Sequence, residues 1–80
     1  MAVYEIFTGP GCAHCEAAKA LLRQHGLAYA ERDVSDPEVM GELQTRLPRV
    51  RAIPQVFFNG EHLGNDEDLQ HHLCRPRVDV

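Results

Sequence analysis

The chain has 80 residues, 44% of them hydrophobic and 25% charged, and a formal net charge of −4 at pH 7. This length predicts one small domain spanning residues 1–80, with room for only a modest core. The acidic balance argues against nucleic acid as a partner, because phosphate contacts need a basic surface. Neither a membrane span nor a signal peptide is recognisable. We therefore expect a cytoplasmic monomer, in which the three cysteines stay reduced rather than forming a disulfide framework.

The first third of the chain predicts a strand, a loop and a helix. Residues 3–7 (VYEIF) are rich in strand-forming residues, and residues 9–11 (GPG) break that pattern. Residues 13–24 are good helix formers, and Gly26 suits the end of a helix. Apolar residues at helical spacing predict a buried stripe on this helix, made of Ala17, Ala18, Leu21 and Leu22.

The middle of the chain predicts one more strand and one more helix. Residues 27–33 have a strand-like pattern of moderate strength. Ser35 or Asp36 can cap a helix, and Pro37 suits its first turn. We expect this helix to run to about residue 46.

The last third predicts a β-hairpin followed by a helix. Residues 55–58 form the third predicted strand, and Asn59–Gly60 is a strong signal for a tight turn. His62–Leu63 then begins a fourth strand, and Asn65 or Asp66 can cap the last helix. The order β-α-β-α-β-β-α predicts an α/β fold with a parallel pair of strands and an antiparallel edge.

Cys12 and Cys15 lie between the first predicted strand and the first predicted helix. A thiol at this place faces unpaired backbone N–H groups and the positive end of the helix dipole, which favour the nucleophilic thiolate. Cys15 lies one turn further into the helix, so we expect Cys12 to attack and Cys15 to resolve. Half of a zinc site and two ordinary packed cysteines are the alternatives. The strand–loop–CxxC–helix context favours a thioredoxin-like redox dithiol.

Two segments of the chain resemble the glutaredoxin family. Residues 5–22 (EIFTGPGCAHCEAAKALL) carry the dithiol, and residues 52–69 (AIPQVFFNGEHLGNDEDL) match the family's proline turn, hairpin and acidic helix start. The whole chain resembles a small bacterial-type dithiol glutaredoxin. The resemblance implies a thioredoxin-like fold, with a mixed four-stranded sheet flanked by three helices. It also implies reduction of protein disulfides and glutathione mixed disulfides, with glutathione as co-substrate, no metal, and glutathione reductase and NADPH as the indirect electron source.

The resemblance further implies a glutathione site around the cysteines. Pro54 would be a cis-proline that faces them, and the Ile53 backbone would pair with the cysteinyl part of glutathione. His14 occupies the family's usual tyrosine position, and Arg51 stands where many members have an arginine near the glycyl carboxylate. The segment expected to hold the γ-glutamyl end comprises Gly64, Asn65, Asp66 and Glu67.

Besides His14, four positions depart from the family pattern. Ala13 replaces the usual proline between the cysteines, and Gly9 stands where many relatives have a lysine. Ala52 replaces a threonine, and Asn65 replaces the second glycine of a Gly-Gly pair. Since Asn tolerates a left-handed backbone better than most residues, the turn at Asn65 can form without that glycine. We expect glutathione binding that is weaker than is typical of the family.

Three rival functions are compatible with the sequence. One is a redoxin that is recharged by thioredoxin reductase and serves ribonucleotide reductase. Another is a carrier of an iron–sulfur cluster held between two protomers with glutathione, as in some relatives that lack the proline of the motif. The third is a zinc module, suggested by the HHLC cluster of His71, His72 and Cys74.

Overall fold

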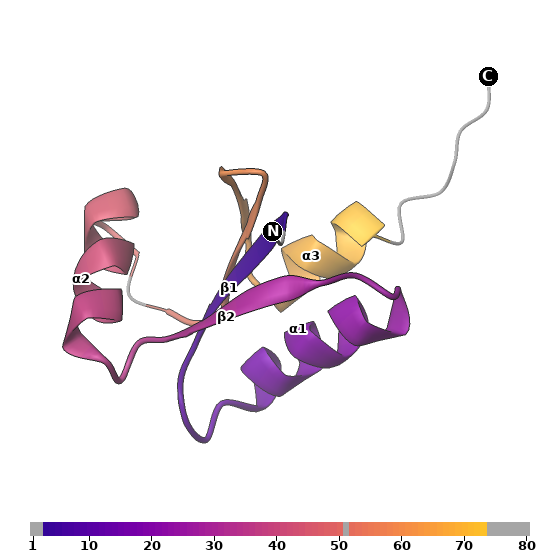
Figure 1. The fold of residues 1–80 in the computed structure, drawn as a ribbon, viewed down its shortest axis with the longest axis horizontal. Coiled ribbons are helices and arrows are strands. Elements are labelled where there is room, and N and C mark those ends of the chain that lie inside the picture. The colour runs from indigo at the N-terminus through magenta and orange to yellow at the C-terminus, as the bar shows by residue number, and fades with distance from the viewer. Residues whose placement is uncertain (1–2, 51, 74–80) are drawn as a thin grey trace.

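The computed structural model describes residues 3–50 and 52–73, which form four strands and three helices. Strand β1 pairs in parallel with β2 and antiparallel with β3, and β3 pairs antiparallel with β4, in the order β2-β1-β3-β4. This is the expected thioredoxin-like architecture, with a mixed four-stranded sheet and three helices (Figure 1). The elements are β1 (Tyr4–Thr8), α1 (Ala13–Gln24), β2 (Tyr29–Asp33), α2 (Pro37–Arg46), β3 (Gln55–Phe58), β4 (Glu61–Gly64) and α3 (Asp66–Leu73).

The limits of α1 and β3 agree with the sequence prediction, whereas the start of β2 does not. Residues 27–28 precede the strand, because the Leu27 N–H still donates to the Leu22 carbonyl at 3.0 Å and closes the end of α1. Gly26 lies in that turn with a φ of 67°, which suits glycine at the end of a helix. The predicted apolar stripe of α1 was also too wide, since Ala17 is exposed while Ala18 and Leu22 are buried.

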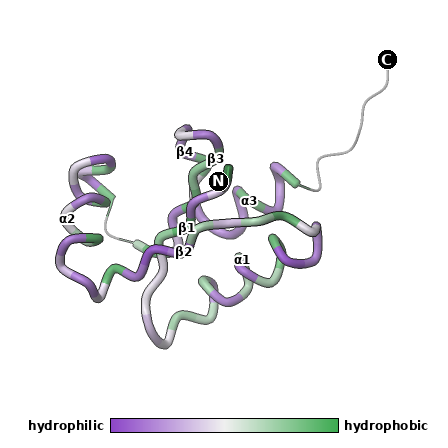
Figure 2. Tube along the Cα trace, viewed as in Figure 1, coloured by the Kyte–Doolittle hydropathy of each residue, from purple (hydrophilic) through white to green (hydrophobic). Residues whose placement is uncertain are grey.

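The two faces of the sheet carry separate cores. Side chains alternate along β1, so Ile6 packs on one face with Leu22 of α1 and Leu69 of α3. Phe7 points to the other face and packs with Leu43 of α2. Figure 1 accordingly shows α2 apart from α1 and α3, across the sheet from them. Figure 2 shows hydrophilic and hydrophobic residues alternating around α2, as expected for a helix with only one buried side.

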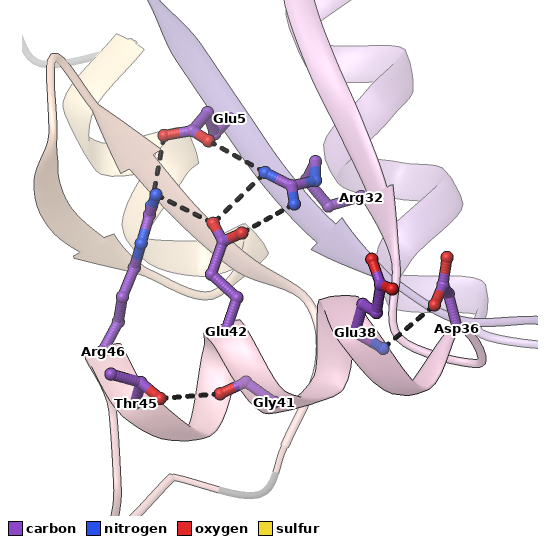
Figure 3. A network of polar contacts seen from close by, with 8 residues as sticks. All are labelled: Glu5, Arg32, Asp36, Glu38, Gly41, Glu42, Thr45 and Arg46. Atoms are coloured by element: carbon purple, nitrogen blue, oxygen red, sulfur yellow. Dashed lines mark hydrogen bonds and ion pairs between the residues drawn. The ribbon is translucent and has the colours of Figure 1, made fainter.

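A network of four charged side chains fastens α2 to the sheet (Figure 3). Arg32 of β2 donates two hydrogen bonds to Glu42 of α2, at 2.7 and 3.2 Å. Arg46 of α2 pairs with Glu42 at 2.9 Å and with Glu5 of β1 at 3.2 Å. Both guanidinium groups lie 5.7 Å from the centre of the Phe7 ring, within reach of a cation–π interaction. The hydrogen bonds from Arg32 hold the pKa of the Glu42 carboxyl below its ordinary value.

Two predicted local signals are confirmed in the structure. Asn59 and Gly60 both have positive φ, at 56° and 86°, as the tight hairpin turn between β3 and β4 requires. At the start of α2 the cap is Asp36, whose carboxylate accepts the Glu38 N–H at 3.0 Å (Figure 3). Within residues 3–50 and 52–73, no helix has the length and apolar character needed to span a membrane.

Candidate active site

Cys12 is the residue that caps the N-terminus of α1. Its backbone is extended, and its Sγ accepts the N–H of Cys15 at 3.1 Å. The first-turn N–H groups of a helix have no partner within the helix, so a sulfur at this place is held by donors that favour negative charge. Cys12 is half-buried. The Cys12 sulfur thus lies at the N-terminal end of α1 and is only partly covered by the protein.

Cys15 is fully buried in the first turn of α1. Burial raises the pKa of its thiol to about 12, and the hydrogen bond with Cys12 acts in the same direction. The backbone of Gly9 and the charge of Lys19 oppose this rise in the pKa of Cys15. The two sulfurs therefore differ in kind, with an accessible one at the helix end and a protonated one behind it.

The segment that leads into β3 packs against the loop that precedes the cysteines. The Ile53–Pro54 peptide bond is cis, and Pro54 is fully buried. A Cβ placed on Gly9 would lie 2.7 Å from Cδ1 of Ile53, which is closer than carbon atoms approach without displacement. A side chain at position 9 would have to displace the end of the Ile53 side chain, so Gly9 allows the two segments to approach closely.

Gln55 holds this segment in place and was not among the predicted site residues. Its side-chain amide donates to the Ala52 carbonyl at 2.9 Å, and its side-chain oxygen lies 2.7 Å from the imidazole of His62. Gln55 is buried, so both polar ends of the side chain need the partners that they have. The signal in the sequence was a lone amide that begins an otherwise apolar strand, QVFF.

The N-terminus of α3 is closed by a reciprocal capping box. Asn65 is the cap, because its Oδ1 accepts the Asp68 N–H while Asp68 Oδ2 accepts the Asn65 N–H, each at 3.1 Å. Gly64 precedes it with a φ of 126°, and Asp68 packs so tightly over Gly64 that a Cβ there would collide with the carboxylate. Asp68 was not predicted as a site residue, and its carboxylate accepts the N–H of Asn65, a residue of the segment expected to hold the γ-glutamyl end of glutathione.

His14 and Asp66 connect the two helix ends. The imidazole Nδ1 of His14 lies 3.0 Å from Oδ2 of Asp66, although 52 positions separate the two residues. The His14 side chain is 74% exposed and that of Asp66 only 18%, so the carboxylate is held in place while the imidazole projects into solvent. Glu67 is exposed beside Asp66. Arg51, the remaining predicted contact, lies outside the described residues.

The HHLC cluster is only partly within the described chain. His72 lies 3.2 Å from the Tyr4 hydroxyl and contacts the Phe58 ring, so it packs α3 onto the sheet. His71 is exposed, and Cys74 lies outside the described residues. Among residues 3–50 and 52–73, no group of three or more His, Cys, Asp or Glu side chains could hold a metal ion.

A thioredoxin-like fold with a dithiol at the start of α1 defines a thiol–disulfide oxidoreductase. The model of the family described as "Glutaredoxin" matches residues 4–63 of this chain. A glutaredoxin of Neisseria meningitidis is 35% identical over 86% of this chain and 82% of its own length. The chain therefore belongs to the glutaredoxin family.

Other similar proteins extend the comparison. A hybrid peroxiredoxin of Haemophilus influenzae is 36% identical over 86% of this chain, which spans only 28% of that longer protein. The solution structure of a glutaredoxin from Brucella melitensis has a TM-score of 0.74 and 36% identity, over 99% of this chain and 86% of that one. A buckwheat glutaredoxin solved with glutathione also has a TM-score of 0.74, over 91% of this chain and 70% of that one. At 22% identity this last likeness concerns the fold.

Proposed function

We propose that this protein is a glutathione-dependent oxidoreductase that reduces protein disulfides and glutathione mixed disulfides. The observation that carries the proposal is the unequal pair of thiols at the start of α1. Cys12 caps the helix with its sulfur, and Cys15 is fully buried one turn behind it. Membership of the glutaredoxin family supports glutathione as the co-substrate.

The glutathionylated-substrate reaction needs Cys12 alone. The Cys12 thiolate attacks the glutathione sulfur of the mixed disulfide, so an S–S bond forms between Cys12 and glutathione, and the substrate leaves as a thiolate that takes a proton from water. A second glutathione thiolate then attacks the glutathione sulfur of this adduct. Oxidised glutathione leaves, and Cys12 returns to the thiolate.

The protein-disulfide reaction needs both cysteines. Cys12 attacks one sulfur of the substrate disulfide, which leaves the other sulfur as a thiolate. Cys15 then loses its proton to that leaving thiolate and attacks the Cys12 sulfur, releasing the fully reduced substrate and a Cys12–Cys15 disulfide. Two glutathione molecules reduce this disulfide and become oxidised glutathione, which glutathione reductase and NADPH would recycle in the cytoplasm.

The glutathione contacts in this proposal surround Cys12. The Ile53 backbone beside cis-Pro54 would pair with the cysteinyl unit of glutathione as a short added strand, and Arg51 would meet its glycyl carboxylate. The Asp66 carboxylate, which lies at the start of α3, would meet the γ-glutamyl ammonium. Further contacts to the γ-glutamyl end would come from Gly64, Asn65 and Glu67, and His14 would lie beside the Cys12 nucleophile.

The decisive experiment is turnover of the glutathione mixed disulfide of 2-mercaptoethanol, coupled to glutathione reductase and NADPH. Native protein should turn over and Cys12→Ser should not, because the nucleophile is missing. Cys15→Ser should retain this activity while losing reduction of a protein disulfide. Turnover by Cys12→Ser, or loss of both activities in Cys15→Ser, would refute these roles. Activity only with thioredoxin reductase would identify a different electron source.

A further inference from the structure

A groove of mainly apolar lining lies beside the active site, between α2 and the segment that leads to β3. Its volume is about 330 Å³, which is at the small end of the range for ligand pockets. Among the described residues that line it, none has a charged side chain and only Gln44 has a polar one. The lining residues are Val34, Met40, Leu43, Gln44, Val50 and Ile53.

Ile53 belongs both to this groove and to the active site. Its side chain lines the groove, and its Cδ1 lies against Gly9 in the loop that leads to Cys12. Its backbone immediately precedes cis-Pro54. In the proposed function this edge pairs with the cysteinyl unit of glutathione, and a polypeptide strand would take the same place when its own disulfide is attacked by Cys12. Val34, another lining residue, approaches Gly9 from the β2 side. Ile53 and Val34 therefore join the groove to the loop that leads to Cys12.

A substrate strand next to Ile53 would place its side chains alternately toward and away from the protein. A side chain that flanks the reacting cysteine and points toward α2 would reach the groove. The described lining residues of the groove carry no charge, so they would not compensate the desolvation of a charged side chain, whereas an apolar side chain gains from burial against them. Glutathione has only glycine after its cysteine and leaves such a groove empty.

We propose that this groove binds an apolar side chain of the polypeptide whose disulfide is reduced, next to its reacting cysteine. The groove thus distinguishes polypeptide substrates by their sequence, while small glutathione mixed disulfides are treated alike. This inference rests on the proposed function, because it takes the dithiol as the site of reaction.

The test uses the symmetric disulfide dimers of pentapeptides of sequence Gly-Xaa-Cys-Xaa-Gly, with Leu, Gly or Asp at both flanking positions, so that Cys12 attacks a peptide sulfur. Native protein should prefer the Leu peptide to the Gly peptide by about tenfold in kcat/KM, from the burial of one apolar side chain, and should disfavour the Asp peptide. Met40→Glu should abolish the preference, because it puts a carboxylate in the groove. Thr45→Glu is the matched control, since it adds the same charge to an exposed position of α2 outside the lining and should keep the preference.

Two further readouts make the outcome unambiguous. The mixed disulfide of 2-mercaptoethanol should be reduced equally by native protein and both variants, and if native protein fails with it, the proposed function fails rather than the groove. In that case the amide shifts of Val34, Met40 and Val50 on adding a Leu peptide with serine for cysteine test the groove directly. Equal rates for all peptides, or a Leu preference that survives in Met40→Glu, would overturn the inference.

The remaining outcomes concern folding and self-association. If Met40→Glu does not fold, Val50→Asp replaces it, because Val50 lies in a loop of the same lining. Self-association of native protein in sedimentation, lost in the groove variant but kept in Thr45→Glu, would show that a second copy occupies the groove. That result would also overturn the inference.

Discussion

The N-termini of α1 and α3 meet at the same site but satisfy their backbone groups in opposite ways. Every helix leaves its first N–H groups without partners inside the helix. At α1 the N–H of Cys15 donates to the sulfur of Cys12, the nucleophile of the proposed function. At α3 the donors of Asn65 and Asp68 are accepted by the side chains of the same two residues. We call the N-terminus of α1, which is capped by the sulfur of Cys12, the open end. We call the N-terminus of α3, which is capped by its own capping box, the closed end.

The two helix caps therefore have different roles in the proposed function. The cap of α1 supplies the nucleophile, and the cap of α3 stabilises its helix. A sulfur is a poorer cap than an Asn or Asp oxygen, so α1 gives up some stability to keep a nucleophile at its end. The capping box of α3 restores order next to it, and the pair of His14 and Asp66 links the two ends. Substitutions that exchange the two kinds of cap should therefore separate activity from stability.

The largest expected effect comes from making the end of α1 resemble that of α3. Cys12→Asp should abolish reduction of the mixed disulfide, by at least about 10³-fold, because no nucleophilic sulfur remains. Stability should be kept or rise by up to about 1 kcal/mol, because Asp is a preferred cap and its charge suits the helix dipole. Urea unfolding measures the stability, and the coupled assay measures reduction of the mixed disulfide. Cys12→Ala is the control, because it has neither the nucleophile nor a helix cap. A Cys12→Asp protein less stable than Cys12→Ala would contradict the capping role.

The next effect concerns the buried thiol behind the open helix end. Burial raises the pKa of Cys15 to about 12, against about 8.5 for a free thiol. Between these values the folded protein keeps a proton that the unfolded chain has lost, so stability falls as the pH rises through this window. The slope contributed by Cys15 is at most about 1.4 kcal/mol per pH unit.

Unfolding of the reduced protein in urea between pH 7 and pH 10.5 measures this slope. Cys15→Ala is the control, because it lacks the titrating group while other groups still titrate. The native curve should fall more steeply with pH than the Cys15→Ala curve. Parallel curves would show that the Cys15 pKa is ordinary and that the two thiols are less different than the structure indicates.

A smaller effect tests the closed end. Asn65→Ala removes the cap of α3 and should lower stability by about 1 kcal/mol, within the usual range for lost helix caps. Gln70→Ala, at an exposed position in the same helix, should change stability by less than about 0.5 kcal/mol. Thermal unfolding of the two variants under identical conditions makes the comparison. Equal stability of both would mean that the hydrogen bonds of the box do not hold the helix end.

The sequence predicted features that depend on neighbours in the chain better than features that depend on contacts across the fold. Breakers at residues 9–11 and at Gly26 fixed α1, and Asn59–Gly60 fixed the hairpin, because these residues set the backbone locally. The bond from Gln55 to Ala52 and the box at Asn65 also involve near neighbours, but each has several possible partners in the sequence. His14 and Asp66 are separated by 52 positions in the sequence, so no local sequence pattern predicts their contact.

The smallest predicted effect lies at that contact between the two helix ends. In the proposed function the Asp66 carboxylate meets the γ-glutamyl ammonium of glutathione, and His14 now occupies one of its oxygens at 3.0 Å. A side-chain hydrogen bond contributes about 1 kcal/mol net, so removing this competitor with His14→Phe should lower the KM for glutathione by up to about fivefold, with kcat unchanged.

Asp66→Asn provides the control for this competition. In that background His14→Phe should have no further effect on the KM, because the carboxylate that His14 contacts is gone. The native protein, the two single variants and the double variant form a double-mutant cycle. If His14→Phe instead raises the KM, and does so only when Asp66 is present, His14 holds the carboxylate in its binding position. The contact between His14 and Asp66 would then assist glutathione binding. The binding of glutathione by Asp66, at the start of α3, would depend on His14 at the start of α1.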